Sequence, residues 1–260
     1  MGVTDVRKVA RSLLTSWDER DPTTTIKLGN GRRVPRFVVT HGLAAHTHEV
    51  TAAALDLLDQ DRDLAAMPLV RAAFESALTA HWVALTADGW AAFMNEEIRQ
   101  RAAHVSTLAA AASQAFRDAA STLSYGDLAR LDTTASARNF HSICWDLAPG
   151  GEDAYAVYRL LSHMSHASVM VVEQYVDEID SSPGVALRVE PKRSDPAIWI
   201  WFLATSLVWA GRAVDYFDTK HQRRSELRAA ARALGTPSEL KLSERAVVRE
   251  QGTSSDSAAR

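Results

Sequence analysis

The sequence predicts an all-α fold: an irregular helical bundle of about six to seven helices, with an N-terminal loop region and a disordered C-terminal tail. Three observations favour this fold. Apolar residues recur every three or four positions in several long segments, as on the buried side of an amphipathic helix. Turn-forming residues separate these segments. The composition, with 47% hydrophobic and 23% charged residues, is that of an ordinary folded protein.

A chain of 260 residues can build one substantial core. We therefore expect a single helical-bundle domain over residues 1–235 and a mostly disordered tail over residues 236–260. The last nine residues, 252–260, are small and polar, and such a composition does not bury enough apolar surface to order itself.

The first half of the chain predicts four helices, over about 3–17, 38–61, 64–86 and 90–120. In the first of them, Val6, Leu13 and Trp17 follow the spacing of one helix face. The first two helices are separated by residues 18–37, which contain two prolines and Gly29-Asn30-Gly31. These turn residues predict a loop or a short hairpin inside the domain.

The second half is irregular at first. Residues 124–151 are rich in turn signals and contain a possible short helix at 128–131. A long helix is predicted from Ala154 to about Glu178, before a Ser-Ser-Pro-Gly sequence. Beyond it we expect an extended segment over 185–189, a helix over 196–217 and a charged helix over 223–234. Asp195 followed by Pro196 is a strong signal for the start of a helix.

Charge and cysteine content restrict the setting. The net charge of −3 gives no overall attraction to nucleic acid or to an anionic membrane, so the basic stretch Lys220 to Arg232 is the best local patch for such a partner. The single Cys144 excludes an internal disulfide, and its apolar neighbours predict a buried, inert thiol. Charges among the first eleven residues interrupt any leader-like apolar run. We therefore expect a reducing, cytoplasmic location.

The uncharged segment from Pro196 to Gly211 requires comparison with a membrane span. It is sixteen residues long, shorter than the ~20 residues that cross a bilayer, and charged residues close it at both ends. A buried core helix is the favoured interpretation. Its three tryptophans are also typical of subunit interfaces, so a homodimer is an alternative use of this helix.

The predicted helix from Ala154 to Glu178 concentrates polar side chains on one side. With ~100° per residue, one sector holds Tyr158, Arg159, Ser162, His163 and His166. The opposite arc is apolar and would pack into the core. A solvated polar face is the simplest interpretation, but two His and two Ser without a Lys are unusual for such a face.

A second unusual pair lies in the third predicted helix. Arg71 and Glu75 are four residues apart within an otherwise apolar run. Embedded charges need partners that offset their desolvation. The pair is either a structural ion pair, or it points at the His-rich face of the later helix. In the second arrangement Arg71 binds an anion and Glu75 orients a histidine.

Metal binding is a further alternative, because His41 and His48 on one helix and His163 and His166 on another could converge on one ion. The arrangement resembles the three-His bundles of DinB-like metalloproteins, although those pair two histidines four apart and here the spacing is three. No Glu-x-x-His motif, Gly-x-Ser-x-Gly elbow or phosphate-binding glycine loop occurs in the sequence. We therefore expect neither a metal nor a cofactor.

Arg159, followed after six intervening residues by His166, resembles the Arg-x(four to six)-His motif of HEPN-domain proteins. Many members of that family are dimeric, metal-independent ribonucleases in toxin, abortive-infection and CRISPR-associated systems. The resemblance implies RNA as a partner, a charge-stabilising role for Arg159 and proton transfer by His166. Leu160 stands where that family usually has a polar residue.

A second resemblance covers about Ala65 to Asp177. Leu69-Val70-Arg71-Ala72-Ala73-Phe74-Glu75, together with Tyr158-Arg159-Leu160-Leu161-Ser162 and His166, is similar to an uncharacterised bacterial family of helical domains of unknown function. By this resemblance, members of that family share an Arg-x-x-x-Glu helix and a later Tyr-x-x-x-Ser-x-x-x-His helix. The resemblance implies that Arg71, Glu75, Tyr158, Ser162 and His166 form one cluster.

Two functions follow from these observations. The first is a HEPN-like ribonuclease in bacterial defence, with Arg159 and His166 as catalytic residues. The second is a non-catalytic helical domain in which the cluster fixes packing or binds a small anion or a partner. Close approach of Arg159 to His166 is the geometric condition that favours the first function over the second.

Overall fold

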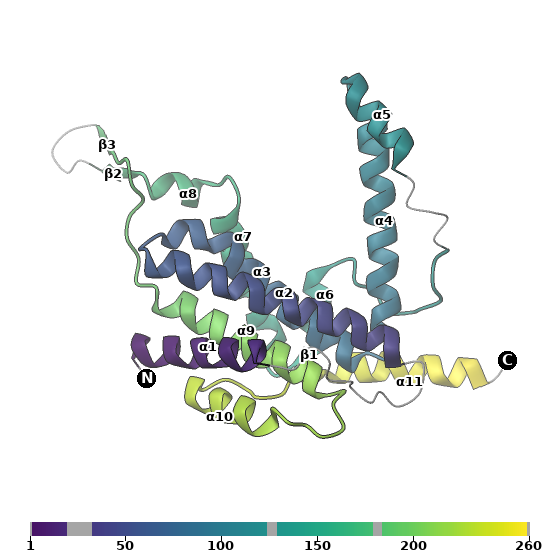
Figure 1. Ribbon diagram of the computed structural model, residues 1–260. Helices are drawn as coiled ribbons and strands as arrows, with labels where there is room; N and C mark the ends of the chain where they lie inside the picture. Colours follow the sequence, from purple (N-terminus) through teal and green to yellow (C-terminus); the bar gives the residue numbers. More distant parts are fainter. Residues whose placement is uncertain (1, 20–32, 124–128, 179–183, 259–260) are drawn as a thin grey trace.

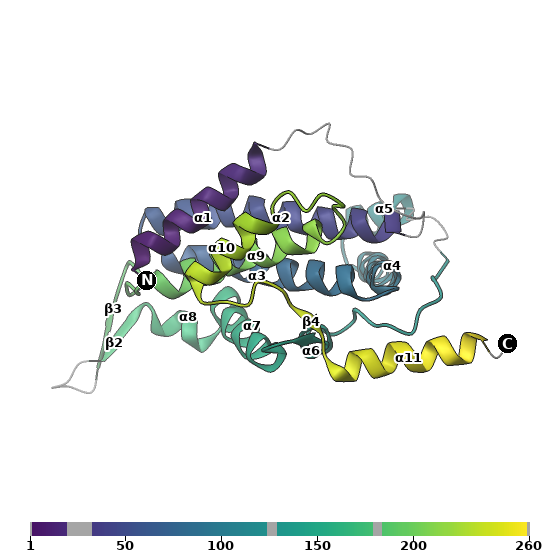
Figure 2. The same cartoon turned by 90° about the horizontal axis from the view of Figure 1, so that it is seen from below.

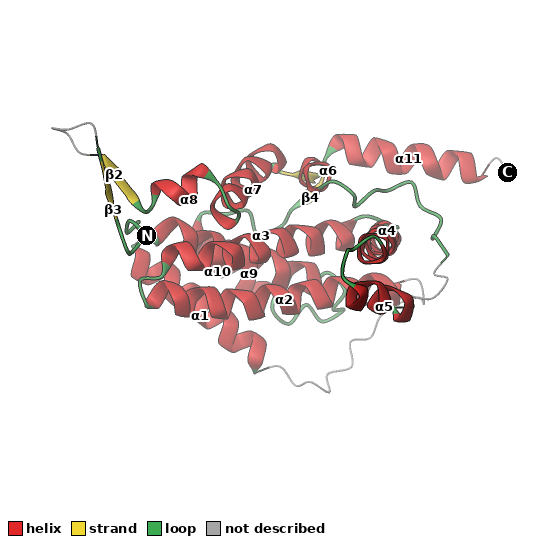
Figure 3. Cartoon of the chain, turned by 90° about the horizontal axis from the view of Figure 1, so that it is seen from above, coloured by secondary structure: helices red, strands yellow, loops and turns green. Residues whose placement is uncertain are grey.

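In the computed structural model, the structure describes residues 2–19, 33–123, 129–178 and 184–258. Within these ranges the fold is all-α, as the sequence predicts, with eleven helices and only very short strands (Figure 3). The helices are α1 (Val3–Asp18), α2 (Arg33–Asp59), α3 (Asp63–Leu85), α4 (Gly89–Ala109), α5 (Gln114–Thr122), α6 (Phe140–Trp145), α7 (Gly151–Ser165), α8 (Val169–Glu173), α9 (Ala197–Asp215), α10 (Arg224–Leu234) and α11 (Glu244–Ala258). The count exceeds the predicted six to seven because two predicted long helices are each divided in two and because α6 and α11 were not predicted.

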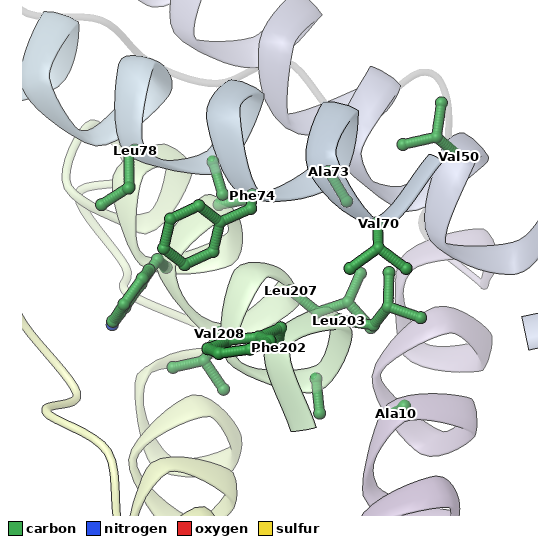
Figure 4. Packing of buried hydrophobic residues seen from close by; sticks show 14 of the residues in the cluster. Ala10, Val50, Val70, Ala73, Phe74, Leu78, Phe202, Leu203, Leu207 and Val208 are labelled. Atoms are coloured by element: carbon green, nitrogen blue, oxygen red, sulfur yellow. The ribbon is translucent and has the colours of Figure 1, made fainter. Parts of the chain in front are cut away.

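The core is built around α9, which packs against α1, α2, α3 and α10 (Figure 1). Phe74 of α3 meets the ring of Phe202 of α9 edge-on, with ring centroids 5.8 Å apart, and Leu203 and Leu207 of α9 are completely buried in the same layer (Figure 4). A helix that is apolar on every side is normally a core helix. Among the described residues α9 alone is long and apolar enough to cross a membrane, and 83% of its apolar window is buried inside the protein.

The predicted start and end of two helices are confirmed by their capping contacts. Ala197 donates its backbone N–H to Asp195 Oδ1 at 2.9 Å, which satisfies one of the free amides at the start of α9. Gly235 follows α10 with a φ of +66°, a conformation that glycine adopts without a Cβ penalty.

The predicted helix over 90–120 is divided into α4 and α5, which project from the body of the protein (Figure 1). Ser113 precedes α5 in an extended conformation. Arg117 of α5 donates to the carbonyl oxygens of Ala111 and Ala112 at 2.6 and 2.7 Å. Those carbonyls belong to the break between the helices, so a side chain replaces the helical hydrogen bonds lost there.

The prediction of a disordered tail from residue 236 is wrong for the described part of that segment. Strand β4 (Lys241–Leu242) pairs antiparallel with β1 (Leu147–Ala148), and α11 begins beside α6 and extends away from it (Figure 2). Leu240 and Ala246 are buried, and Arg249 makes two hydrogen bonds to Asp146. A few anchoring contacts order a segment whose average composition predicts disorder.

The loop before α2 and the irregular segments of the second half differ in part from the sequence predictions. The hairpin expected around Asn30 lies outside the described residues, and α2 begins at Arg33, five residues before the predicted start. Residues 129–131 are not helical, and α6 was not predicted. Strand β3 (Val185–Leu187) confirms an extended segment there and pairs antiparallel with β2 (Val176–Glu178).

Candidate functional site

The long helix expected from Ala154 to Glu178 is not continuous. Helix α7 ends at Ser165, and His166 has an extended backbone with φ −120° and ψ 164°. Ser168 then begins α8: its Oγ accepts from the backbone N–H of Val171 at 3.3 Å and donates to the carbonyl oxygen of His163 at 2.5 Å. A serine in this position offers the chain a cap in place of continued helix. His166 therefore leaves the helical angle that the sequence predicts for it.

Helices α7 and α3 pack against each other and bring the two unusual sequence segments together. Leu161 and Ala154 of α7 are buried, with Leu161 fully inside the core. Tyr158 lies between them along the helix, so its half-buried ring faces the same neighbour. Arg71 and Glu75 occupy consecutive turns of α3 on that side.

Three side chains converge on the guanidinium group of Arg71. Its Nη1 lies 2.6 Å from Nε2 of His166, and its Nη2 donates to the hydroxyl oxygen of Tyr158 at 2.9 Å. The carboxylate of Glu75 is 3.7 Å from Nη2. We call these four residues, Arg71, Glu75, Tyr158 and His166, the Arg71 cluster. The guanidinium carbon also lies 5.0 Å from the centre of the Tyr158 ring, within the range of a cation–π contact.

The contact with Arg71 fixes the tautomer of His166. A guanidinium only donates hydrogen bonds, so Nε2 of His166 must accept, and the ring proton is then on Nδ1. Tyr158 likewise accepts from Arg71, which leaves its own O–H proton free to donate. The cluster therefore contains two donors not used by Arg71, the Nδ1–H of His166 and the Tyr158 hydroxyl, beside the acceptor carboxylate of Glu75.

Arg71 retains unused donor capacity. Its side chain is only 22% exposed, and its buried Nε–H has no hydrogen-bond partner among the described residues. An unsatisfied buried donor costs about 1–3 kcal/mol.

The surroundings of Glu75 affect two ionisable groups. Partial burial raises the pKa of the Glu75 carboxyl above its ordinary value near 4.5, against the opposing effect of Arg71. Cys144 is completely buried, and desolvation, together with the nearby Glu75 charge, raises the pKa of its thiol to about 12. Cys144 is thus a neutral, inert thiol, as the sequence predicts.

The other predicted site residues lie outside the Arg71 cluster. Ser162 is half-buried, and its Oγ donates to the carbonyl oxygen of Tyr158 at 2.8 Å within the same helix. Arg159 and His163 are exposed. Among the described residues Arg159 makes no hydrogen bond or ion pair, and the guanidinium that contacts His166 belongs to Arg71.

The four histidines considered as metal ligands do not converge. His41 and His48 stack on Trp17, with ring centroids 5.6 and 3.9 Å apart, while His166 contacts Arg71. In the described part of the chain, no group of three or more His, Cys, Asp or Glu side chains is arranged to hold a metal ion.

The sequence interpretation missed the contribution of α6. Phe140 lies against the Tyr158 ring, with centroids 4.4 Å apart, on the edge of the Arg71 cluster. The signal for α6 was present: Asn139 precedes it, and its side chain accepts from the backbone N–H of His141 at 3.0 Å. An Asn followed by an aromatic and apolar run is a typical helix start.

A model of a family of unknown function, DUF5677, matches residues 37–183. This is more than half of the chain and contains all four residues of the Arg71 cluster. The chain belongs to this family. The resemblance to an uncharacterised helical family, based on the Arg71 and Tyr158 segments, is therefore confirmed. The DUF5677 description gives no reaction. No curated protein and no solved structure matches the chain.

Proposed function

We propose that the chain is a metal-independent ribonuclease whose active site is the Arg71 cluster. One observation carries the proposal: an imidazole, a phenol and a carboxylate from two helices all surround a single guanidinium. A guanidinium is suited to bind a phosphate through two parallel hydrogen bonds. The three groups around it are those that can move protons or donate hydrogen bonds at that phosphate.

In the proposed reaction the 2′-oxygen of RNA attacks the adjacent phosphorus, and the bond from phosphorus to the 5′-oxygen breaks. Glu75 accepts the proton of the 2′-hydroxyl. The phosphate takes over the N–H groups of Arg71, which frees Nε2 of His166 to take up a proton and give it to the leaving oxygen. Arg71 and the Tyr158 hydroxyl stabilise the charge that develops on the phosphate. The products are a 2′,3′-cyclic phosphate and a 5′-hydroxyl.

Among the described residues, the approach of Arg159 to His166 that the HEPN-like pair requires is not observed, so that pair does not support the proposal and the proposal depends on Arg71 instead. Arg71 reaches His166 from a different helix, and Arg159 is exposed beside the site. His166 keeps the proton-transfer role that the resemblance implies. Arg71 is then the arginine that binds the reacting phosphate, and Arg159 could contact a phosphate farther along the RNA strand.

The pH dependence of cleavage follows from Glu75. Its carboxyl must be ionised to accept a proton, and burial raises its pKa above the ordinary value near 4.5. Activity is therefore expected to be lost as pH falls through that raised pKa. In the variant Glu75→Gln this acidic limb of the pH profile should disappear together with most of the activity.

Cleavage of a labelled single-stranded RNA, in buffer containing a chelator, tests the proposal. We expect the natural sequence to cleave and His166→Ala to lose about 10²–10⁴-fold in rate, the usual contribution of an acid–base residue. Ser162→Ala is the matched control, because Ser162 lies on α7 one turn before His166 and, among the described residues, its hydroxyl bonds only within α7. The products should carry cyclic phosphate ends.

The ribonuclease proposal fails if RNA survives equally with the natural sequence and with His166→Ala. It also fails if cleavage needs added metal. A thermal melt of each variant separates loss of chemistry from loss of folding.

A second candidate function is supported by the Arg71–His166 contact itself. In this state Nε2 of His166 is occupied by Arg71, and the donors of Arg71 and Tyr158 suit binding of an anion without catalysis. Binding of inorganic phosphate or RNA without cleavage, lost in Arg71→Ala, would favour this function over the first.

A further inference from the structure

The Arg71 cluster continues into a line of aromatic rings. Tyr158 stacks with Tyr155 at 6.1 Å between ring centroids, Tyr155 meets His141 at 4.5 Å, and His141 meets Trp145 at 4.7 Å. We call these four residues the aromatic row. It leads from the proposed catalytic site along α7 and onto α6.

The outer end of the aromatic row is open to solvent. Trp145 is 38% exposed, and His141 and Tyr155 are half-buried. Tyr155 and Tyr158, like Phe140, also pack against the core, which holds the inner rings of the row in place. The exposed part of the Trp145 ring is where a base could stack.

We propose that the aromatic row is a stacking platform for the bases of a single-stranded RNA whose phosphate is held by Arg71. This inference rests on the proposed function, because it takes RNA as the ligand. It adds that the RNA is single-stranded. Unstacked bases lie on aromatic rings and on guanidinium planes, whereas the bases of a duplex are already stacked on each other. The site should therefore select single strands.

The charges around the aromatic row are mixed. Arg159 is one helical turn from Tyr155, and the guanidinium carbon of Arg245 lies 5.9 Å from the ring centre of Trp145. The exposed carboxylates of Glu152 and Asp153 occupy the first turn of α7. Stacking must therefore supply much of the affinity. If Arg71, Arg159 and Arg245 each contact one phosphate, the slope of log K against log salt should be about −2.

The test is fluorescence anisotropy of a labelled hexanucleotide of mixed RNA sequence, measured with His166→Ala so that binding is seen without cleavage. Replacing Trp145 by Ala in this background is expected to weaken binding by about 10-fold, within the effect of losing one stacked base. Trp145→Phe keeps a ring and should restore most of the affinity. Phe116→Ala removes an aromatic ring that is 55% exposed on α5 and should change nothing.

The platform would be overturned if Trp145→Ala bound the hexanucleotide as tightly as the His166→Ala background does. Equal affinity for a hairpin duplex and for the single strand, or no binding of RNA at all, would also overturn it. The two proposals fail separately. Cleavage by the natural sequence with no effect of Trp145→Ala removes the platform alone. Binding through Trp145 without any cleavage by the natural sequence removes the ribonuclease alone.

Discussion

Gly151→Ala is expected to lower the free energy of unfolding by about 3 kcal/mol or more, a loss typical of severe overpacking. Gly151 is the first residue of α7, and a Cβ there would overlap the carbonyl oxygen of Cys144 and lie 3.0 Å from its carbonyl carbon. Those atoms are backbone, so no rotamer change relieves the overlap. The substitution forces α7 away from α6 and separates Tyr158 from Phe140.

Gly42→Ala is the matched control for this prediction. Gly42 is an exposed residue inside α2, and a Cβ added there meets nothing within 4 Å. Alanine in a helix is more stable than glycine by roughly 0.5–1 kcal/mol, so this variant should be slightly stabilised. Urea unfolding of both variants measures the difference. Equal stabilities would mean that α6 and α7 do not approach as described.

Arg249→Ala is expected to lower the free energy of unfolding by about 3 kcal/mol, because it leaves the buried carboxylate of Asp146 without its main partner. Asp146 has a side chain only 3% exposed, and it accepts from Arg249 Nη1 and Nη2 at 3.0 and 2.6 Å. It also accepts from the indole N–H of the fully buried Trp82 at 3.1 Å. This contact attaches α11 to the core.

The double variant Asp146→Asn, Arg249→Ala tests the cause of that loss. Asparagine keeps an oxygen for Trp82 and removes the buried charge. The double variant should therefore be more stable than Arg249→Ala alone, and the cycle should be clearly non-additive. Additive losses would show that Arg249 acts through packing and not through the charge of Asp146.

Sequence patterns predicted the elements whose signals are local. Helices α3, α9 and α10 follow from apolar periodicity and from caps such as Asp195 and Gly235. The break at His166 was missed because Ser168 is compatible with a continuing helix, and only its hydrogen bonds to Val171 and His163 reveal the cap. Helix α11 was missed because its few anchors, Ala246 and Arg249, do not raise the average hydrophobicity of the segment.

The candidate site was predicted in composition but not in pairing. Arg71, Glu75, Tyr158, Ser162 and His166 were predicted as one cluster; the structure brings four of them together, while the Ser162 hydroxyl bonds within its own helix. The sequence could not decide which arginine faces His166. The angular position of Arg159 around its helix places it within the polar sector. Which arginine contacts His166, however, is decided by the position of α3 relative to α7. That position depends on packing far from the site.

The most direct test of the account compares two arginine variants in the cleavage of single-stranded RNA at saturating concentration. Arg71→Ala should lower the rate by about 10²–10³-fold, the usual cost of removing a charge-stabilising donor, while Arg159→Ala should cleave at nearly the natural rate. Arg71→Lys keeps the charge and loses the paired donors, so its cleavage rate should lie between those of the two alanine variants. The reverse order, with Arg159→Ala inactive and Arg71→Ala active, would contradict the Arg71 cluster as the catalytic site.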